Sequence, residues 1–164
     1  MKILMVCLGN ICRSPLAEGI MRHKLMNNQI DASVESCGFE SFHVGDKADR
    51  RAAQVAAENG VDLSGHRART FKVSFFDEFD RIYVMDNKNF SDVASKARNS
   101  EDLKKVDYIM NMVYPGTNMA VPDPYYGGQD GFRKTWNKLG GATEKIVGGN
   151  KGLKKKNKLI NNRL

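Results

Sequence analysis

Residues 2–15 read KILMVCLGNICRSP, and this stretch decides how the chain folds. The run KILMV at 2–6 is short and apolar, as is typical of a central strand that is buried on both faces of a parallel sheet. Residues 7–14 then form a loop with one glycine. Pro15 suits the first turn of a helix, where its missing N–H costs nothing. The chain is therefore predicted to open as strand, loop and helix.

Outside this stretch, strand-like and helix-like segments alternate. We predict further strands at 33–37, 80–85 and 106–112 and further helices at 47–59, 88–98 and 130–147. The stretch 61–79 shows no clear pattern, and 114–131 is a long loop with three prolines, of a length that is often functional. This alternation predicts a single-domain α/β sandwich with a mostly parallel sheet, which binds its ligand at the carboxyl ends of the strands.

The charge of the chain is concentrated at its end. The net charge is +7, but six of the 26 basic residues lie at 151–164, which leaves 20 basic against 19 acidic residues at 1–150. We therefore expect one domain over 1–150 followed by a basic, disordered tail at 151–164, and no nucleic-acid partner.

Cysteine use and hydropathy indicate the compartment. The three cysteines, Cys7, Cys12 and Cys37, show no regular spacing and do not read as a disulfide framework. The apolar opening is too short for a secretory signal or a membrane span. We expect a cytoplasmic protein with free thiols, no stable membrane insertion and, by default, a monomeric state.

The loop at 7–14 has the groups that a phosphate monoester needs. The N-terminus of a helix offers unpaired N–H groups and a positive dipole end, and Gly9 lets the backbone turn tightly. Arg13 can bind two phosphate oxygens with its planar fork. Cys7 is then placed as a nucleophilic thiolate, and Ser14 can donate a hydrogen bond to it. The remaining candidates for phosphate contact are Leu8, Asn10, Ile11 and Cys12. The ATP-binding pattern G-x-x-x-x-G-K-[ST] does not occur.

Four separated motifs carry a family resemblance. VCLGNICRSPLAE at 6–18 resembles the signature of the low-molecular-weight protein tyrosine phosphatases, and PDPYYGG at 122–128 resembles the second signature of that family. FHVGDKAD at 42–49 and SGHRAR at 64–69 fit as well, so that the likeness spans about residues 2–133. The resemblance implies a four-stranded parallel sheet flanked by helices, phosphotyrosine-containing proteins as partners, and no metal or other cofactor.

The same resemblance implies roles for individual residues. Cys7 is the nucleophile, Arg13 the phosphate clamp and Asp123 the general acid. A carboxylic acid on a mobile loop suits protonation of a leaving phenolate, and two flanking prolines hold Asp123 in extended backbone. The aromatic residues Phe42, Tyr125 and Tyr126 resemble walls around the substrate ring, and Asn10 and His66 are similar to residues that brace the loop.

Other interpretations of the sequence remain open. A phosphoarginine phosphatase is one, although the bulky Ile11 favours an aromatic ring over the small polar residue of that branch. Arsenate reduction requires further cysteines downstream, and none follows Cys37. A phosphate-binding module without catalysis is a third. Cys12 is expected to be a redox partner of Cys7, while Cys37 and His43 receive no role.

The glycines at 140, 141, 148 and 149 lie in the last predicted helix. Each lowers helix propensity by about 1 kcal/mol relative to alanine. We therefore expect that helix to be short or frayed.

Overall fold

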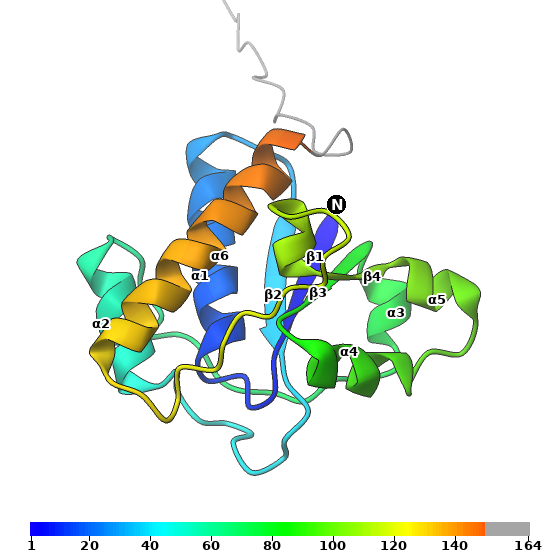
Figure 1. Ribbon diagram of the computed structural model, residues 1–164, viewed down its shortest axis with the longest axis horizontal. Helices are drawn as coiled ribbons and strands as arrows, with labels where there is room; N and C mark the ends of the chain where they lie inside the picture. Colours follow the sequence, from blue (N-terminus) through cyan, green and yellow to red (C-terminus); the bar gives the residue numbers. More distant parts are fainter. Residues whose placement is uncertain (150–164) are drawn as a thin grey trace, which may run out of the picture.

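The computed structural model describes residues 1–149 of the chain. Its sheet has four strands, β1 (Lys2–Val6), β2 (Ser33–Cys37), β3 (Arg81–Val84) and β4 (Val106–Tyr108). They lie in the order β2-β1-β3-β4 and every pair is parallel (Figure 1). The predicted fold class, a single-domain α/β sandwich with a four-stranded parallel sheet, is thus confirmed.

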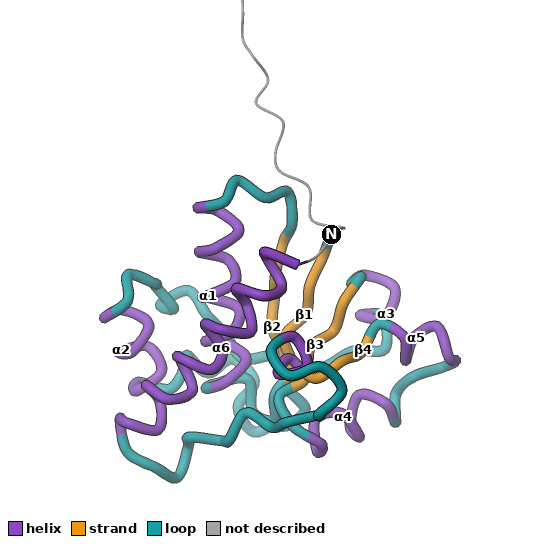
Figure 2. The backbone as a smooth tube through the Cα atoms, turned by 45° about the horizontal axis from the view of Figure 1, so that its top comes forward, coloured by secondary structure: helices purple, strands orange, loops and turns teal. Residues whose placement is uncertain are grey.

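The helices form a layer on each face of the sheet (Figure 2). One layer contains α1 (Arg13–Asn27), α2 (Arg50–Glu58) and α6 (Gln129–Gly149), which contact one another. The other contains α3 (Phe75–Glu78), α4 (Asn87–Ala94) and α5 (Ser100–Lys104). Because side chains of a strand alternate between faces, β1 contributes to two separate cores.

The two cores explain why β1 is apolar at every position after Lys2. Ile3 and Met5 are fully buried in the core beneath α1 and α6. Leu4 and Val6 are fully buried on the opposite face, in a core that includes Phe76. The central strand is therefore fixed on both faces and by neighbours on both edges, so that the loop that follows it starts from a rigid point.

Helix α1 begins at Arg13, two residues before the predicted start. Pro15 therefore occupies the third position of the helix, still within the first turn, where the backbone N–H has no partner in the helix. Its fixed φ is compatible with helical geometry there. The loop between β1 and α1 is accordingly short, and both of its ends are held by regular structure.

Apart from small shifts in the ends of elements, the structure differs from the sequence predictions in three places besides the last helix. Two short helices were missed, α3 within the unassigned stretch 61–79 and α5 after the predicted helix at 88–98. β4 ends at Tyr108, and Ile109–Met112 form a 3-10 helix, η1, where a longer strand was predicted.

The expectation of a short or frayed last helix is wrong, since α6 has 21 residues. Its buried face, with Phe132, Leu139 and Ile146, packs in the core shared with α1, and such packing outweighs weak intrinsic propensity. The predicted basic tail at 151–164 lies outside the described residues.

Candidate active site

The candidate site is the loop between β1 and α1, at the carboxyl end of the central strand. The N–H of Cys7 still donates to the carbonyl oxygen of Cys37, at 3.3 Å, which extends the β1–β2 ladder by one residue. The sulfur of Cys7 lies 3.0 Å from the hydroxyl oxygen of Ser14. The first turn of α1 thus directs its N–H groups and its positive dipole end toward the loop that carries Cys7.

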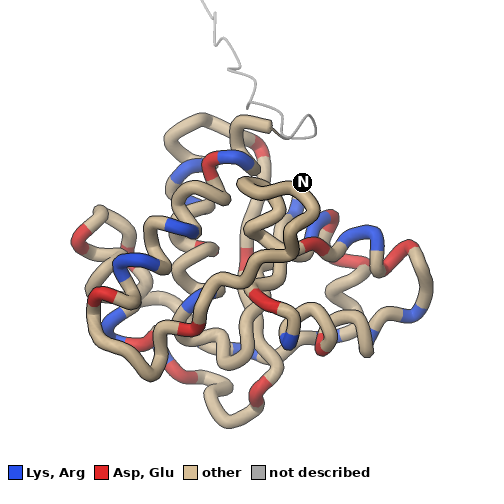
Figure 3. Tube along the Cα trace, viewed as in Figure 1, with Lys and Arg blue, Asp and Glu red and all other residues tan. Residues whose placement is uncertain are grey.

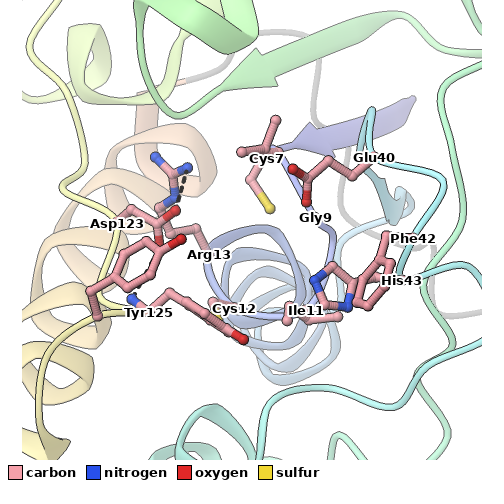
Figure 4. Close-up of a pocket in the computed structure, with 12 residues that line it drawn as sticks. Cys7, Gly9, Ile11, Cys12, Arg13, Glu40, Phe42, His43, Asp123 and Tyr125 are labelled. Carbon is pink, nitrogen blue, oxygen red and sulfur yellow. Dashed lines mark hydrogen bonds and ion pairs between the residues drawn. The ribbon is translucent and has the colours of Figure 1, made fainter.

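Arg13 is buried and connects this loop to two distant segments. Its Nη1 donates to Asp86 Oδ2 at 2.6 Å and to the Val121 carbonyl oxygen at 3.0 Å. Its Nη2 lies 3.4 Å from Asp123 Oδ2 (Figure 4). Burial acts to lower the pKa of Arg13, but the negative charge of Cys7 and the hydrogen bond to Asp86 outweigh it and raise the pKa. The guanidinium therefore stays charged in a site with little solvent.

Asn10 fixes the shape of the loop from inside. It is fully buried and adopts a left-handed backbone with φ of 55°, which asparagine tolerates better than most residues. Its Nδ2 donates to Ser14 Oγ at 2.8 Å and to Ser36 Oγ at 2.9 Å, and its Oδ1 accepts from the Arg69 N–H at 3.0 Å. Because Ser14 Oγ accepts this bond, its own hydrogen can point either to the Cys7 sulfur, at 3.0 Å, or to the more distant Cys37 carbonyl oxygen, at 3.4 Å.

His66 braces the same turn from outside. Its Nε2 donates to the backbone carbonyl oxygen of Asn10 at 2.7 Å. This contact holds the backbone of Asn10 in its left-handed conformation. The placement agrees with the bracing role that the resemblance implies for both residues.

A cavity of about 200 Å³ opens over the loop. One wall comes from residues 40–43 and the other from residues 123–126, and Figure 4 shows the two sides facing each other across Cys7. Phe42 and Tyr126 are 84% and 94% exposed, so their rings form the rim, while Tyr125 is more covered. The lining residues are Cys7, Leu8, Gly9, Ile11, Cys12, Arg13, Glu40, Phe42, His43, Asp123, Tyr125 and Tyr126.

Comparison with known proteins gives the family. The family model for low molecular weight phosphotyrosine protein phosphatase matches residues 2–159. The chain is 38% identical over 134 residues to the protein of that name from Schizosaccharomyces pombe, covering 80% of this chain and 85% of the relative. It is 36% identical over 137 residues to the low molecular weight protein-tyrosine-phosphatase of Streptomyces coelicolor, covering 81% and 83%.

The chain belongs to the low molecular weight phosphotyrosine protein phosphatase family.

Solved structures agree with this membership. The protein tyrosine phosphatase of Entamoeba histolytica superposes with a TM-score of 0.83 at 34% identity, over 90% of this chain and 94% of that one. A Drosophila arginine phosphatase superposes equally well, with a TM-score of 0.83 at 28% identity over 90% and 96%. Both are similar to this member of the phosphatase family, so the fold alone does not separate a phosphotyrosine substrate from a phosphoarginine one.

Most of the residues predicted for this member of the family do meet at the cavity. Three of them do not: Asn10 and Ser14 lie behind the loop and support it, and His66 contacts its backbone. Asp86 was not among the predicted site residues. It does cap α4, since its Oδ1 accepts from the Asn89 N–H at 2.9 Å, but its other oxygen binds Arg13. The sequence could have indicated Asp86 as a site residue, because it follows the predicted strand at 80–85 on the edge of the sheet where ligands bind.

Ser36 and Glu40 were missed altogether. Ser36 accepts a hydrogen bond from Asn10, and Glu40 lines the cavity. Both lie at or just beyond the carboxyl end of β2, the strand beside β1. The same edge-of-sheet argument points to this neighbourhood, but no local pattern marks these two side chains.

The three thiols differ in position. Cys7 and Cys12 belong to the core on the α1 side of the sheet and both line the cavity, whereas Cys37 is buried on the opposite face. Burial, and then the negative charge of Asp49, raise the pKa of the Cys12 thiol. Burial likewise raises the pKa of Cys37.

The remaining predictions concern membranes, metals, charge, location and partners. No helix within residues 1–149 is long and apolar enough to cross a membrane. In the same range, no group of three or more His, Cys, Asp or Glu side chains could hold a metal ion. Basic and acidic positions are interspersed along the described trace (Figure 3). The cytoplasmic location, the monomeric state and the expectation of no nucleic-acid partner stay predictions.

Proposed function

We propose that this chain hydrolyses phosphotyrosine, on proteins and in small aryl phosphates, through a phosphocysteine on Cys7. The observation that carries the proposal is that a thiol from the β1–α1 loop and a buried guanidinium at the start of α1 meet a carboxylate from residue 123 at one cavity over a helix N-terminus. Those are the nucleophile, the phosphate clamp and the acid that a phosphomonoester requires.

In the first step, Arg13 and the loop N–H groups bind the equatorial phosphate oxygens. Binding requires Arg13 to present its fork to the phosphate, and its long contact to Asp123, at 3.4 Å, is the one most easily loosened. The Cys7 thiolate attacks phosphorus, and a P–S bond forms as the P–O bond to the phenol breaks. Asp123, protonated, gives its proton to the departing phenolate oxygen.

In the second step, the now ionised Asp123 takes a proton from water. The water oxygen attacks phosphorus, the P–S bond breaks, and inorganic phosphate and the Cys7 thiolate are regenerated. Ser14 supports both steps, because its hydroxyl lies 3.0 Å from the sulfur and can donate to it whenever it carries negative charge.

The cavity walls favour an aromatic leaving group. Phe42 and Tyr125 stand on opposite sides of the cavity, and Ile11 adds an apolar contact between them. A phenyl ring between such walls gains stacking and apolar contact. Phosphoarginine is the second candidate, supported by the likeness to the Drosophila arginine phosphatase. An arsenate reductase and a non-catalytic binding module receive no support of this kind.

The proposal is tested by kinetics on matched phosphotyrosine, phosphoserine and phosphoarginine peptides. We expect the highest kcat/KM on phosphotyrosine, and faster turnover of phosphoarginine would replace the substrate assignment. Cys7→Ser should abolish turnover while it keeps the fold, because a serine hydroxyl stays protonated where the thiolate forms. Circular dichroism and phosphate binding serve as controls, and substantial residual turnover by pure Cys7→Ser protein would exclude Cys7 as nucleophile.

We further propose that the thiols of Cys7 and Cys12 form a reversible disulfide under peroxide. Peroxide oxidises the Cys7 thiolate to a sulfenic acid, and the Cys12 sulfur then displaces water from it. Cys12 is the supported partner because it lines the same cavity, while Cys37 lies across the sheet.

The disulfide proposal predicts different recovery in two cysteine variants. After mild peroxide and then a dithiol reductant, wild-type and Cys37→Ser proteins should regain activity. Cys12→Ser should recover poorly, because its Cys7 continues to irreversible acids. Full recovery of Cys12→Ser, measured with p-nitrophenyl phosphate, would contradict the pairing.

A further inference from the structure

Glu40 is held at the edge of the phosphate loop by its backbone. The N–H groups of Phe39 and Glu40 both donate to the carbonyl oxygen of Leu8, at 2.7 and 3.0 Å. These bonds tie the segment after β2 to the loop after β1. A Cβ atom built on Gly9 would lie 3.6 Å from Glu40 Oε2, so the carboxylate is directly beside the loop. In Figure 4 it points into the cavity, on the side opposite Asp123.

The Glu40 carboxylate has no cationic partner. Within residues 1–149, its side chain makes no hydrogen bond and no ion pair. The cations nearby are engaged elsewhere, because Arg13 binds Asp86 and Asp123, and the His43 ring lies 3.0 Å from Asp46. An unpaired negative charge therefore faces a cavity that receives a phosphate dianion.

Such a charge cannot help to bind phosphate, since like charges repel. It can help only if the substrate brings a cation to it. On the strength of the proposed function, we propose that Glu40 is a specificity-determining residue that selects phosphotyrosine next to a lysine or arginine in the peptide chain. Acidic neighbours, which would add to the repulsion, are selected against.

The geometry of the walls suits a long basic side chain. With the phosphotyrosine ring between Phe42 and Tyr125, the peptide backbone lies at the exposed rim. A lysine or arginine stem can lie along the Phe42 wall and bring its charged end back toward Glu40, because these side chains cover apolar surface while the charge remains solvated. His43, on the same wall, already lies 3.0 Å from Asp46 and offers no free cation to an acidic residue of the peptide.

An interaction between exposed charges acts mainly on association and binding. We therefore expect the attraction between Glu40 and the basic residue to change KM and kcat/KM with little change in kcat. We expect salt to weaken this effect. For one exposed ion pair, the preference for a lysine-flanked peptide over a glutamine-flanked one should be about three-fold in kcat/KM. A glutamate-flanked peptide should be the poorest of the three.

The test uses three phosphotyrosine peptides that differ only in lysine, glutamine or glutamate beside the phosphotyrosine. Each is measured with wild type, Glu40→Gln and Glu78→Gln, at low and high salt. Glu78 is the matched control, an exposed glutamate on α3 away from the cavity whose loss removes the same net charge. Glu40→Gln should lose the lysine preference and should hydrolyse p-nitrophenyl phosphate with a higher kcat/KM, since repulsion of the dianion is relieved. Glu78→Gln should behave as wild type.

The outcomes separate this inference from the function on which it rests. A lysine preference that persists in Glu40→Gln, or that disappears equally in Glu78→Gln, overturns the role of Glu40. So does wild-type protein that hydrolyses all three peptides at one rate. Wild-type protein that hydrolyses neither peptides nor p-nitrophenyl phosphate overturns the proposed function, and this inference with it.

Discussion

Arg13 shares its guanidinium among acceptors from two distant segments, Asp86 after β3 and the stretch that contains Val121 and Asp123. Asp86 in turn both caps α4 and binds Arg13. Individual side chains here therefore serve the fold and the site at once. Substitution of Asp86 would disturb α4 as well as the position of Arg13. Asp123 lies on a loop, so its substitution tests the proposed acid with less effect on the fold.

Asp123→Asn keeps the size of the side chain and its ability to accept the Tyr125 N–H, a contact of 3.1 Å. It removes the transferable proton. With poor leaving groups, the loss of kcat should be about 10²–10⁴-fold, the usual worth of general acid catalysis. With good leaving groups such as p-nitrophenolate the loss should be much smaller. A series of substituted phenyl phosphates measures how the loss of kcat depends on the leaving group. An equal loss across the series would place the acid elsewhere.

At the scale of elements, α1 and α6 contain glycines in opposite situations. A Cβ added at Gly19 of α1 would lie 2.7 Å from Leu63 Cδ2 and 2.9 Å from Val61 Cγ1. A Cβ added at Gly141 of α6 would meet nothing within 4 Å. The first glycine is thus required for packing, and the second only weakens its helix.

These two positions predict stability changes of opposite sign. Gly141→Ala should raise the free energy of unfolding by about 1 kcal/mol, the propensity difference between alanine and glycine. Gly19→Ala should lower it, because overpacking of a tight contact costs about 1–3 kcal/mol. Urea denaturation compares both with wild type. A destabilised Gly141→Ala protein would show that α6 depends on glycine at that position.

Sequence patterns predicted the elements whose own residues show a clear local pattern. The first strand, loop and helix were predicted because burial, a loop and Pro15 occur within fourteen residues. α3 and α5 were missed because each has fewer than six residues and depends on distant partners. For example, Lys105 Nζ donates to the carbonyl oxygen of Phe79, the residue that follows α3, at 3.2 Å. Glu40 was missed for a related reason, since only the pairing of β1 with β2 brings it to the loop.

For the molecule as a whole, the domain boundary at 150 remains a prediction, although the family match extends to residue 159. All cavity-lining residues lie between Cys7 and Tyr126, and α6 ends near the amino-terminal ends of the strands, away from the cavity (Figure 1). Removal of 151–164 should therefore leave kcat and KM for p-nitrophenyl phosphate unchanged. A large fall in kcat, with an unaltered circular dichroism spectrum, would move the boundary beyond 150.

The bonds of Arg13 to Val121 and Asp123 have a consequence for the order in which a ribosome makes this protein. Val121 and Asp123 emerge from the ribosome more than a hundred residues after Arg13, which they contact in the folded protein. Since chains emerge from the amino terminus at a finite rate, the nascent polypeptide contains Cys7 without Asp123 while the residues between them are synthesised. On the proposed mechanism, hydrolysis can begin only after Asp123 has emerged, so a chain cut short before Val121 would contain the proposed nucleophile without the proposed acid.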